Sequence, residues 1–223
     1  MNKLNSIVLI VITLTTLNVF AQNFEGTITY KIEMKNPTPE KVTDSVWQEN
    51  LKKQFGEKGY MIQKYYYKEN KYLSEIDAGE EKGFQVFNPK DGLLYSWQKN
   101  TTEAITVDSK KYMDKITEIE VLDKKEVILG LECKSIRIKS QLGEMILWYN
   151  NDKLKMNKDF YKGHKYGHWE EILKQIGCLP LKIQSNSFFA KMTQTAIEFN
   201  EEKINDEKFN LPEFEKITAN PMN

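Results

Sequence analysis

Apolar and polar residues alternate almost without interruption from Phe24 to Met34. Every second position is apolar or glycine, and the positions between carry threonine, lysine or glutamate. The apolar set is Phe24, Gly26, Ile28, Tyr30, Ile32 and Met34. A period of two is typical of a strand with one face in the core and one in water. The pattern therefore predicts a long, half-buried strand over residues 24–34.

Shorter segments of the same kind follow at close spacing, separated by turn-forming residues such as Asn88-Pro89 and Asp91-Gly92. The predicted strands are 60–68, 71–76, 83–87, 93–98, 104–107, 117–122, 126–129, 131–140, 144–149, 179–185 and 190–199. Residues 145–149 are apolar on both faces, which predicts a central strand covered on both sides. We expect a meander of antiparallel strands and a mainly β (α+β) fold.

Two segments show helical spacing. Residues 40–55 carry a rough apolar stripe that ends at Gly56, and residues 168–176 form a second candidate that ends at Gly177. The residues after Glu201 are mostly polar, so we expect the sheet to be complete before them. Since no long linker divides the chain, we predict a single domain over residues 22–223.

The first 21 residues have the pattern of an export signal. Lys3 supplies the positive start, residues 7–17 are largely apolar, and Val19 and Ala21 are the small residues of a cleavage site. A permanent membrane anchor would need roughly 20 apolar residues, and this run is shorter and interrupted by threonines. We predict cleavage after Ala21 and a bacterial periplasmic or secreted protein that does not span the membrane. Gln22 follows the cut where a lipid-anchored protein would need cysteine.

The charge balance excludes one class of partner. The chain has 32 basic and 32 acidic residues, and Arg137 is its single arginine. Nucleic-acid binding requires a basic surface that replaces phosphate counterions. We therefore expect no nucleic-acid partner.

Two cysteines, Cys133 and Cys178, are present. Export would place them where disulfides form and persist, so we predict a Cys133–Cys178 disulfide. The alternative is two buried free thiols. A redox pair would favour a Cys-x-x-Cys spacing, which is absent.

The two histidines, His164 and His168, are four residues apart and are followed by two glutamates. On one continuous helix this spacing can bind zinc. Gly163 and Gly167 interrupt the segment, so we expect solvated or locally capped histidines. No Gly-x-Ser-x-Gly motif is present either. We therefore assign no metal site, no cofactor and no catalytic residue.

Four segments in order resemble an exported protein family. They are residues 24–30 (FEGTITY), residues 128–134 (ILGLECK), Trp148-Tyr149 and residues 177–183 (GCLPLKI). The chain resembles the GLPGLI-type exported proteins, whose function is largely unassigned. That resemblance implies a fold like the LolA-type periplasmic carriers, in which a strongly curved, unclosed antiparallel sheet forms a half-barrel with about two helices over its mouth. It also implies an apolar concavity suited to acyl chains.

From this resemblance we expect a non-catalytic envelope protein that binds an apolar ligand, a lipid or lipoprotein acyl chain. The expected lining of its concave sheet is Ile28, Tyr30, Ile32, Met34, Leu147 and Trp148. An alternative is a protein-interaction or structural module of the envelope, with a filled concavity and an exposed edge. A third hypothesis is a metal-dependent hydrolase, which requires the two histidines to converge with carboxylates.

Overall fold

The computed structural model describes residues 23–187 and 191–221, so the predicted signal peptide lies outside the described residues. The described chain forms twelve strands, two α-helices and two 3₁₀ turns. In chain order these are β1 (Gly26–Met34), α1 (Asp44–Phe55), β2 (Met61–Lys68), β3 (Lys71–Ala78), β4 (Glu81–Asn88), β5 (Leu93–Gln98), β6 (Glu103–Asp108), β7 (Ile116–Ile128), β8 (Leu131–Ser140), β9 (Gly143–Tyr149), η1 (Tyr166–His168), α2 (Trp169–Ile176), β10 (Lys182–Ser187), β11 (Lys191–Glu201), η2 (Asp206–Phe209) and β12 (Lys216–Ala219). Within the described ranges, no helix has the length and apolar character needed to cross a bilayer.

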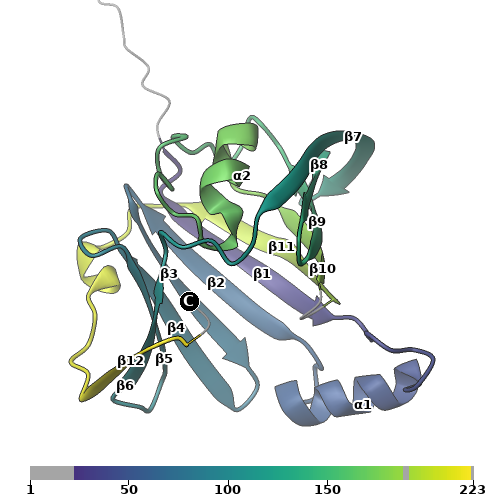
Figure 1. The fold of residues 1–223 in the computed structure, drawn as a ribbon, viewed down its shortest axis with the longest axis horizontal. Coiled ribbons are helices and arrows are strands. Elements are labelled where there is room, and N and C mark those ends of the chain that lie inside the picture. Colours follow the sequence, from purple (N-terminus) through teal and green to yellow (C-terminus); the bar gives the residue numbers. More distant parts are fainter. Residues whose placement is uncertain (1–22, 188–190, 222–223) are drawn as a thin grey trace, which may run out of the picture.

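All twelve described strands belong to one sheet, in the order β12-β6-β5-β4-β3-β2-β1-β11-β10-β9-β8-β7. Neighbours pair antiparallel, except that β12 runs parallel to β6. The sheet bends strongly but does not close, because β12 and β7 remain as its two edges (Figure 1). The predicted fold class, a mainly β protein with a curved, unclosed antiparallel sheet and two helices, is confirmed.

Two predicted strands, 117–122 and 126–129, are one strand in the structure. β7 runs through Asp123 and Lys124, and its register against β8 shifts between Leu122 and Glu126. Turn-forming residues that predicted a break are instead accommodated in this irregularity, which bends a strand without ending it.

The segment between β9 and β10 fills part of the concave side of the sheet. It carries α2, which lies in front of the sheet in Figure 1. Ile172 and Ile176 of α2 pack in one buried cluster with Ile136, Leu147 and Ile183 of the sheet. The helix is therefore held by its apolar face, as expected for a short helix whose stability comes from packing.

Helix α1 is held less firmly, at the end of β1. Thr43 caps it by accepting a hydrogen bond from the Val46 backbone N–H, and Leu51 is its buried residue. The indole Nε1 of Trp47 donates to the Met34 carbonyl at 3.3 Å. α1 therefore sits at the rim of the sheet and leaves most of its own surface in water (Figure 1).

The C-terminal segment covers the opposite, outer face of the sheet. Ile204 and Phe209 are buried against Leu73 and Val86, and the ring of Phe214 stacks near Tyr95 with the planes 4° apart. The chain then adds β12 beside β6. The prediction that the sheet is complete before the tail was wrong, because a few apolar residues without strand periodicity anchor this segment.

Candidate ligand-binding site

The register of the strands defines rows of side chains across the concave face, since residues directly opposite each other on neighbouring strands share a face. The row farthest from α1 is apolar and buried or half-buried: Tyr67, Tyr72, Phe87, Leu94 and Val107. The segment between β9 and β10 packs on this row; for example, Tyr161 contacts Tyr72 edge to face. This part of the concave face is therefore closed by protein.

Three of the six predicted lining residues lie in the main core. Ile28, Tyr30 and Trp148 belong to one buried cluster, and the Tyr30 hydroxyl donates to the Pro180 carbonyl at 2.7 Å. That bond ties β1 to the segment that fills the concavity. The structure therefore places these side chains inside packed protein.

Leu147 and Trp148 are adjacent on β9 and point to opposite faces of the sheet. Leu147 lies in the cluster under α2, whereas the ammonium of Lys182 sits 4.8 Å from the centre of the Trp148 ring. One surface cannot be lined by both side chains.

Ile32 and Met34 lie nearer the rim of the same β1 face. Met34 is opposite Met192 of β11, and Ile32 is opposite Met61 of β2. The three methionines are half-buried, while Ile32 is buried. Flexible, polarisable methionine side chains adapt to irregular apolar partners, so this rim is suited to contact an apolar molecule.

A polar band lies between the aromatic row and the open end. Gln194 donates to Gln63 at 3.5 Å, and Gln63 donates to Ser74 at 3.3 Å. Farther along, Gln85 of β4 donates to Ser96 of β5 at 3.1 Å. Sequence patterning did not reveal this band, because its residues alternate like ordinary strand positions.

A cavity of about 390 Å³ opens beside this band, on β3 to β6. Gly83 stands between Ile76 and Gln98 in the register and contributes no side chain, which leaves a hollow. Ile105 of β6, 53% exposed, flanks it. The full lining is Ile76, Gly83, Phe84, Gln85, Ser96, Trp97, Gln98, Thr101, Glu103, Ala104, Ile105 and Thr218. Aliphatic walls and a partly amide floor make this an amphipathic groove.

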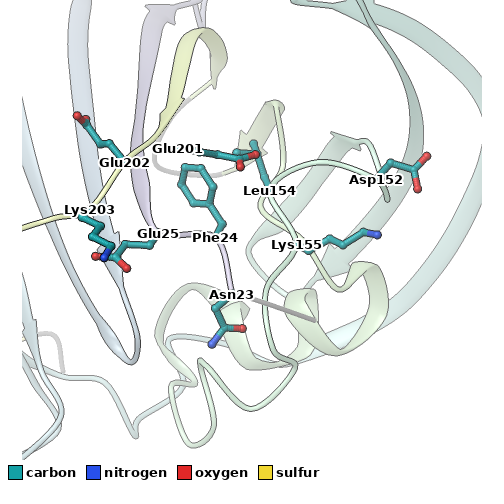
Figure 2. Close-up of a pocket in the computed structure, with 9 residues that line it drawn as sticks. All are labelled: Asn23, Phe24, Glu25, Asp152, Leu154, Lys155, Glu201, Glu202 and Lys203. Atoms are coloured by element: carbon teal, nitrogen blue, oxygen red, sulfur yellow. The ribbon is translucent and has the colours of Figure 1, made fainter. Parts of the chain in front are cut away.

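A second cavity, of about 490 Å³, lies where β1 begins and β11 ends (Figure 2). Two of its four carboxylates already have roles: Glu25 accepts the Ile204 backbone N–H at 2.9 Å, and Glu202 accepts the Thr27 hydroxyl at 3.2 Å. Figure 2 shows Glu202 and Asp152 on opposite sides, pointing away from each other. The cavity therefore presents no convergent set of groups among the described residues that line it.

The histidines are buried, so the prediction that they are solvated was wrong. Gly163 and Gly167 have φ of 80° and 68°, and these left-handed turns carry both rings inward. The Nε2 atom of His164 lies 3.1 Å from the Tyr72 hydroxyl. Burial lowers the pKa of His164 to about 4. His168 pairs with Asp114. The two rings have separate partners, and residues 23–187 and 191–221 contain no cluster of three or more His, Cys, Asp or Glu arranged to hold a metal.

The predicted disulfide is not formed in the structure. Cys133 and Cys178 are free and buried, and each packs in a different hydrophobic cluster. The Cys133 thiol points back to the Leu131 carbonyl at 3.5 Å. Both side chains therefore act as small apolar groups.

Comparisons with known proteins identify no family. No family model matches the chain, and no curated protein matches it, so the GLPGLI resemblance stays a prediction. A solved structure of PNGF-II is 16% identical over 88% of this chain, with a TM-score of 0.44, and the chain spans 31% of that protein's length. An uncharacterised conserved protein from Thermus thermophilus gives 8% identity, coverage of 88% and 91%, and a TM-score of 0.48. A putative outer membrane lipoprotein-sorting protein domain from Vibrio parahaemolyticus is 8% identical, with a TM-score of 0.34. The match covers 84% of this chain and 89% of that domain.

Proposed function

We propose that this protein binds an apolar ligand without catalysing a reaction, on the part of the concave sheet that the segment between β9 and β10 leaves open. The observation that carries the proposal is the hollow at Gly83, bordered by Ile76 and by the exposed Ile105. An isoleucine side chain exposed to water beside a hollow is unfavourably hydrated. Covering it with an apolar molecule removes that surface from water and lowers the free energy.

The size of the groove supports this proposal. Small-molecule sites occupy roughly 300–1,000 Å³ and combine apolar walls with a few polar groups, and this groove measures about 390 Å³. Each buried ligand methylene contributes about 0.8 kcal/mol. An alkyl chain lying from the groove towards the methionine rim at Met61 would bury several methylenes. The proposed ligand is the acyl chain of a lipid or lipoprotein, met in the periplasm or outside the cell as the predicted export signal implies.

Titration with the neutral, apolar dye N-phenyl-1-naphthylamine tests the proposal. We expect saturable fluorescence enhancement at micromolar dye, and Gly83→Leu should abolish it by filling the hollow. Gly83 tolerates a side chain, because its φ is not left-handed and the atom nearest an added Cβ is the Trp97 carbonyl oxygen at 3.6 Å.

A matched pair of exposed isoleucines provides the control. Ile105 lines the groove, whereas Ile217 of β12 pairs with Ala104 and faces the other side of the sheet. Ile105→Ser should weaken dye binding several-fold, and Ile217→Ser should leave it unchanged. Equal effects, or no saturable binding by the folded wild-type protein, would refute the proposal.

Binding of a partner protein is a second candidate function, favoured by the exposed edge of the sheet. Val121 and Val127 of β7 are 75% and 71% exposed on a strand that pairs only with β8 among the described strands. An extended segment of another protein can add to such an edge through main-chain hydrogen bonds. A β7-dependent complex in an envelope fraction, lost in Val121→Lys, would support this function.

A further inference from the structure

We infer that the ligand of the groove is a neutral amphiphile, an alkyl chain carrying a carboxamide-type group that both donates and accepts hydrogen bonds. This inference rests on the proposed function and adds the chemistry of the ligand's polar end. It comes from two features of the groove: a glutamine with unused hydrogen-bonding capacity, and a rim whose described cations are already paired with carboxylates.

Gln85 is the glutamine in question. Its Nε2 donates to the Ser96 hydroxyl at 3.1 Å, and its carbonyl oxygen and second amide hydrogen have no partner within the part of the chain that the structure describes. Gln63 differs, because it donates to Ser74 and also accepts from Gln194. The sheet therefore engages both the nitrogen and the oxygen of the Gln63 amide, whereas it engages only the nitrogen of the Gln85 amide and leaves the oxygen for a ligand.

A side-chain amide offers a donor and an acceptor side by side. A ligand group that also has both, such as a carboxamide, can satisfy both atoms of Gln85, whereas an ester can only accept. Because Ile76 and Ile105 flank this position, the remainder of the ligand is expected to be apolar. An amide at the end of an alkyl chain meets both requirements.

Among the described residues, no unpaired cation lines the groove to compensate an anionic end group. Glu103 is the one charged residue among the described residues that line the groove, and its partner is Lys216 of β12, 3.4 Å away. Lys82, at the neighbouring hairpin, pairs with Asp77 at 3.4 Å. A ligand carboxylate in the groove would lose water without gaining an unpaired cation from these residues, which disfavours it relative to a neutral group.

Displacement of the bound dye tests this inference. Dodecanamide, methyl dodecanoate and dodecanoate have the same chain length and differ only in the polar end, so each is titrated against the dye–protein complex at pH 8. We expect the amide to displace the dye at about tenfold lower concentration than the carboxylate, with the ester between them.

Two variants assign the preference to residues. Gln85→Leu should lose the advantage of the amide over the ester, measured as the ratio of the two displacement concentrations on this variant. Glu103→Gln frees Lys216 from its ion pair and should raise the affinity for dodecanoate several-fold relative to the amide. Glu103 is exposed, so this variant tests the inference even if Gln85→Leu does not fold.

The outcomes separate this inference from the function on which it rests. If the dye binds but all three compounds compete equally in wild type and variants, or the carboxylate competes best, the neutral-amphiphile inference is overturned and apolar binding stands. If the folded protein binds no dye, the proposed function itself is overturned.

Discussion

The Oδ1 atom of Asp114 lies 2.6 Å from Nε2 of His168, across 54 residues of sequence. Both side chains are buried, and the second Asp114 oxygen accepts the Leu142 backbone N–H at 3.0 Å. Asp114 precedes β7, Leu142 lies in the β8–β9 turn and His168 immediately precedes α2. This one carboxylate therefore joins three parts of the chain around the filled half of the concavity.

The first prediction concerns the acid stability that Asp114 provides. Burial raises its pKa, but hydrogen bonds from Ser140, Leu142 and His168 outweigh burial, so the pKa lies below its ordinary value. Because the folded-state pKa of this carboxyl is lowered, the carboxylate stabilises the fold fully at pH values above its unfolded-state pKa near 4. The stabilisation is lost as the pH falls through the folded-state pKa. We expect Asp114→Asn to cost roughly 1.5–3 kcal/mol at pH 7. Urea denaturation should show a smaller difference in unfolding free energy between wild type and Asp114→Asn at pH 3 than at pH 7. An equal difference at both pH values would contradict a lowered pKa for Asp114.

The second prediction places a different stability change between pH 6.5 and 4. Burial lowers the pKa of His164 to about 4, so the unfolded chain binds this proton first as the pH falls. The free energy of unfolding should therefore drop by about 3 kcal/mol across this window. His164→Phe removes the titration and should flatten the curve there while leaving the Asp114 change near pH 4. An unaltered slope in His164→Phe would count against a buried, neutral ring.

The third prediction concerns the thiols. Burial raises the pKa of Cys178 to about 12, and the nearby Cys133 thiol adds to this effect. Since the thiolate is the reactive species, a disulfide-exchange reagent should react very slowly with the native protein at pH 8. In denaturant it should label two thiols rapidly. If the reagent labelled no thiol in denaturant, the protein would form the Cys133–Cys178 disulfide.

The fourth prediction compares two glycines four residues apart. Gly79 has φ of 81°, and an added Cβ would lie 2.7 Å from the Phe55 backbone carbon. Gly79→Ala should cost about 1–3 kcal/mol by straining the turn and displacing the end of α1. Gly83→Ala, without either constraint, should change stability by less than about 0.5 kcal/mol. Thermal unfolding of both variants measures this; equal losses would contradict the described geometry.

The fifth prediction tests the C-terminal segment that covers the outer face. Phe209 is buried against Leu73 and Val86, so Phe209→Ala should cost roughly 3–5 kcal/mol. Phe214 is only half-buried, and its replacement by alanine should cost less. Chemical denaturation of the two variants provides the comparison. Equal, small effects would mean that the segment is not anchored at Phe209.

Regular patterns made much of the fold predictable. β1 was predicted because alternation continues over its whole length, and α2 because Ile172, Leu173 and Ile176 are followed by Gly177, which has a left-handed φ of 66° and ends the helix. The sequence did not predict β12, because its four residues are all exposed and Ile217 is its only large apolar residue. Its partner β6 also lies more than a hundred residues earlier in the chain.

The site was less predictable than the fold. Alternation placed Ile28, Tyr30 and Ile32 on one face but could not indicate that the segment from β9 to β10 packs on that face. The hollow at Gly83 depends on the register that places it between Ile76 and Gln98, and register is a property of strand pairing in three dimensions. The buried histidines likewise depend on where two left-handed glycines direct the chain.

The pairing of β1 with β11 also constrains how the molecule folds. The Thr27 hydroxyl reaches Glu202, 175 residues later, and β1 occupies the middle of the sheet. During synthesis β1 meets β2 early, but its other edge has no partner until nearly the whole chain has emerged. Such high contact order slows folding, because the entropy of closing a long loop is lost before the contacts form. Partly synthesised chains therefore expose an apolar strand edge, and we expect slow folding with a need for protection against aggregation.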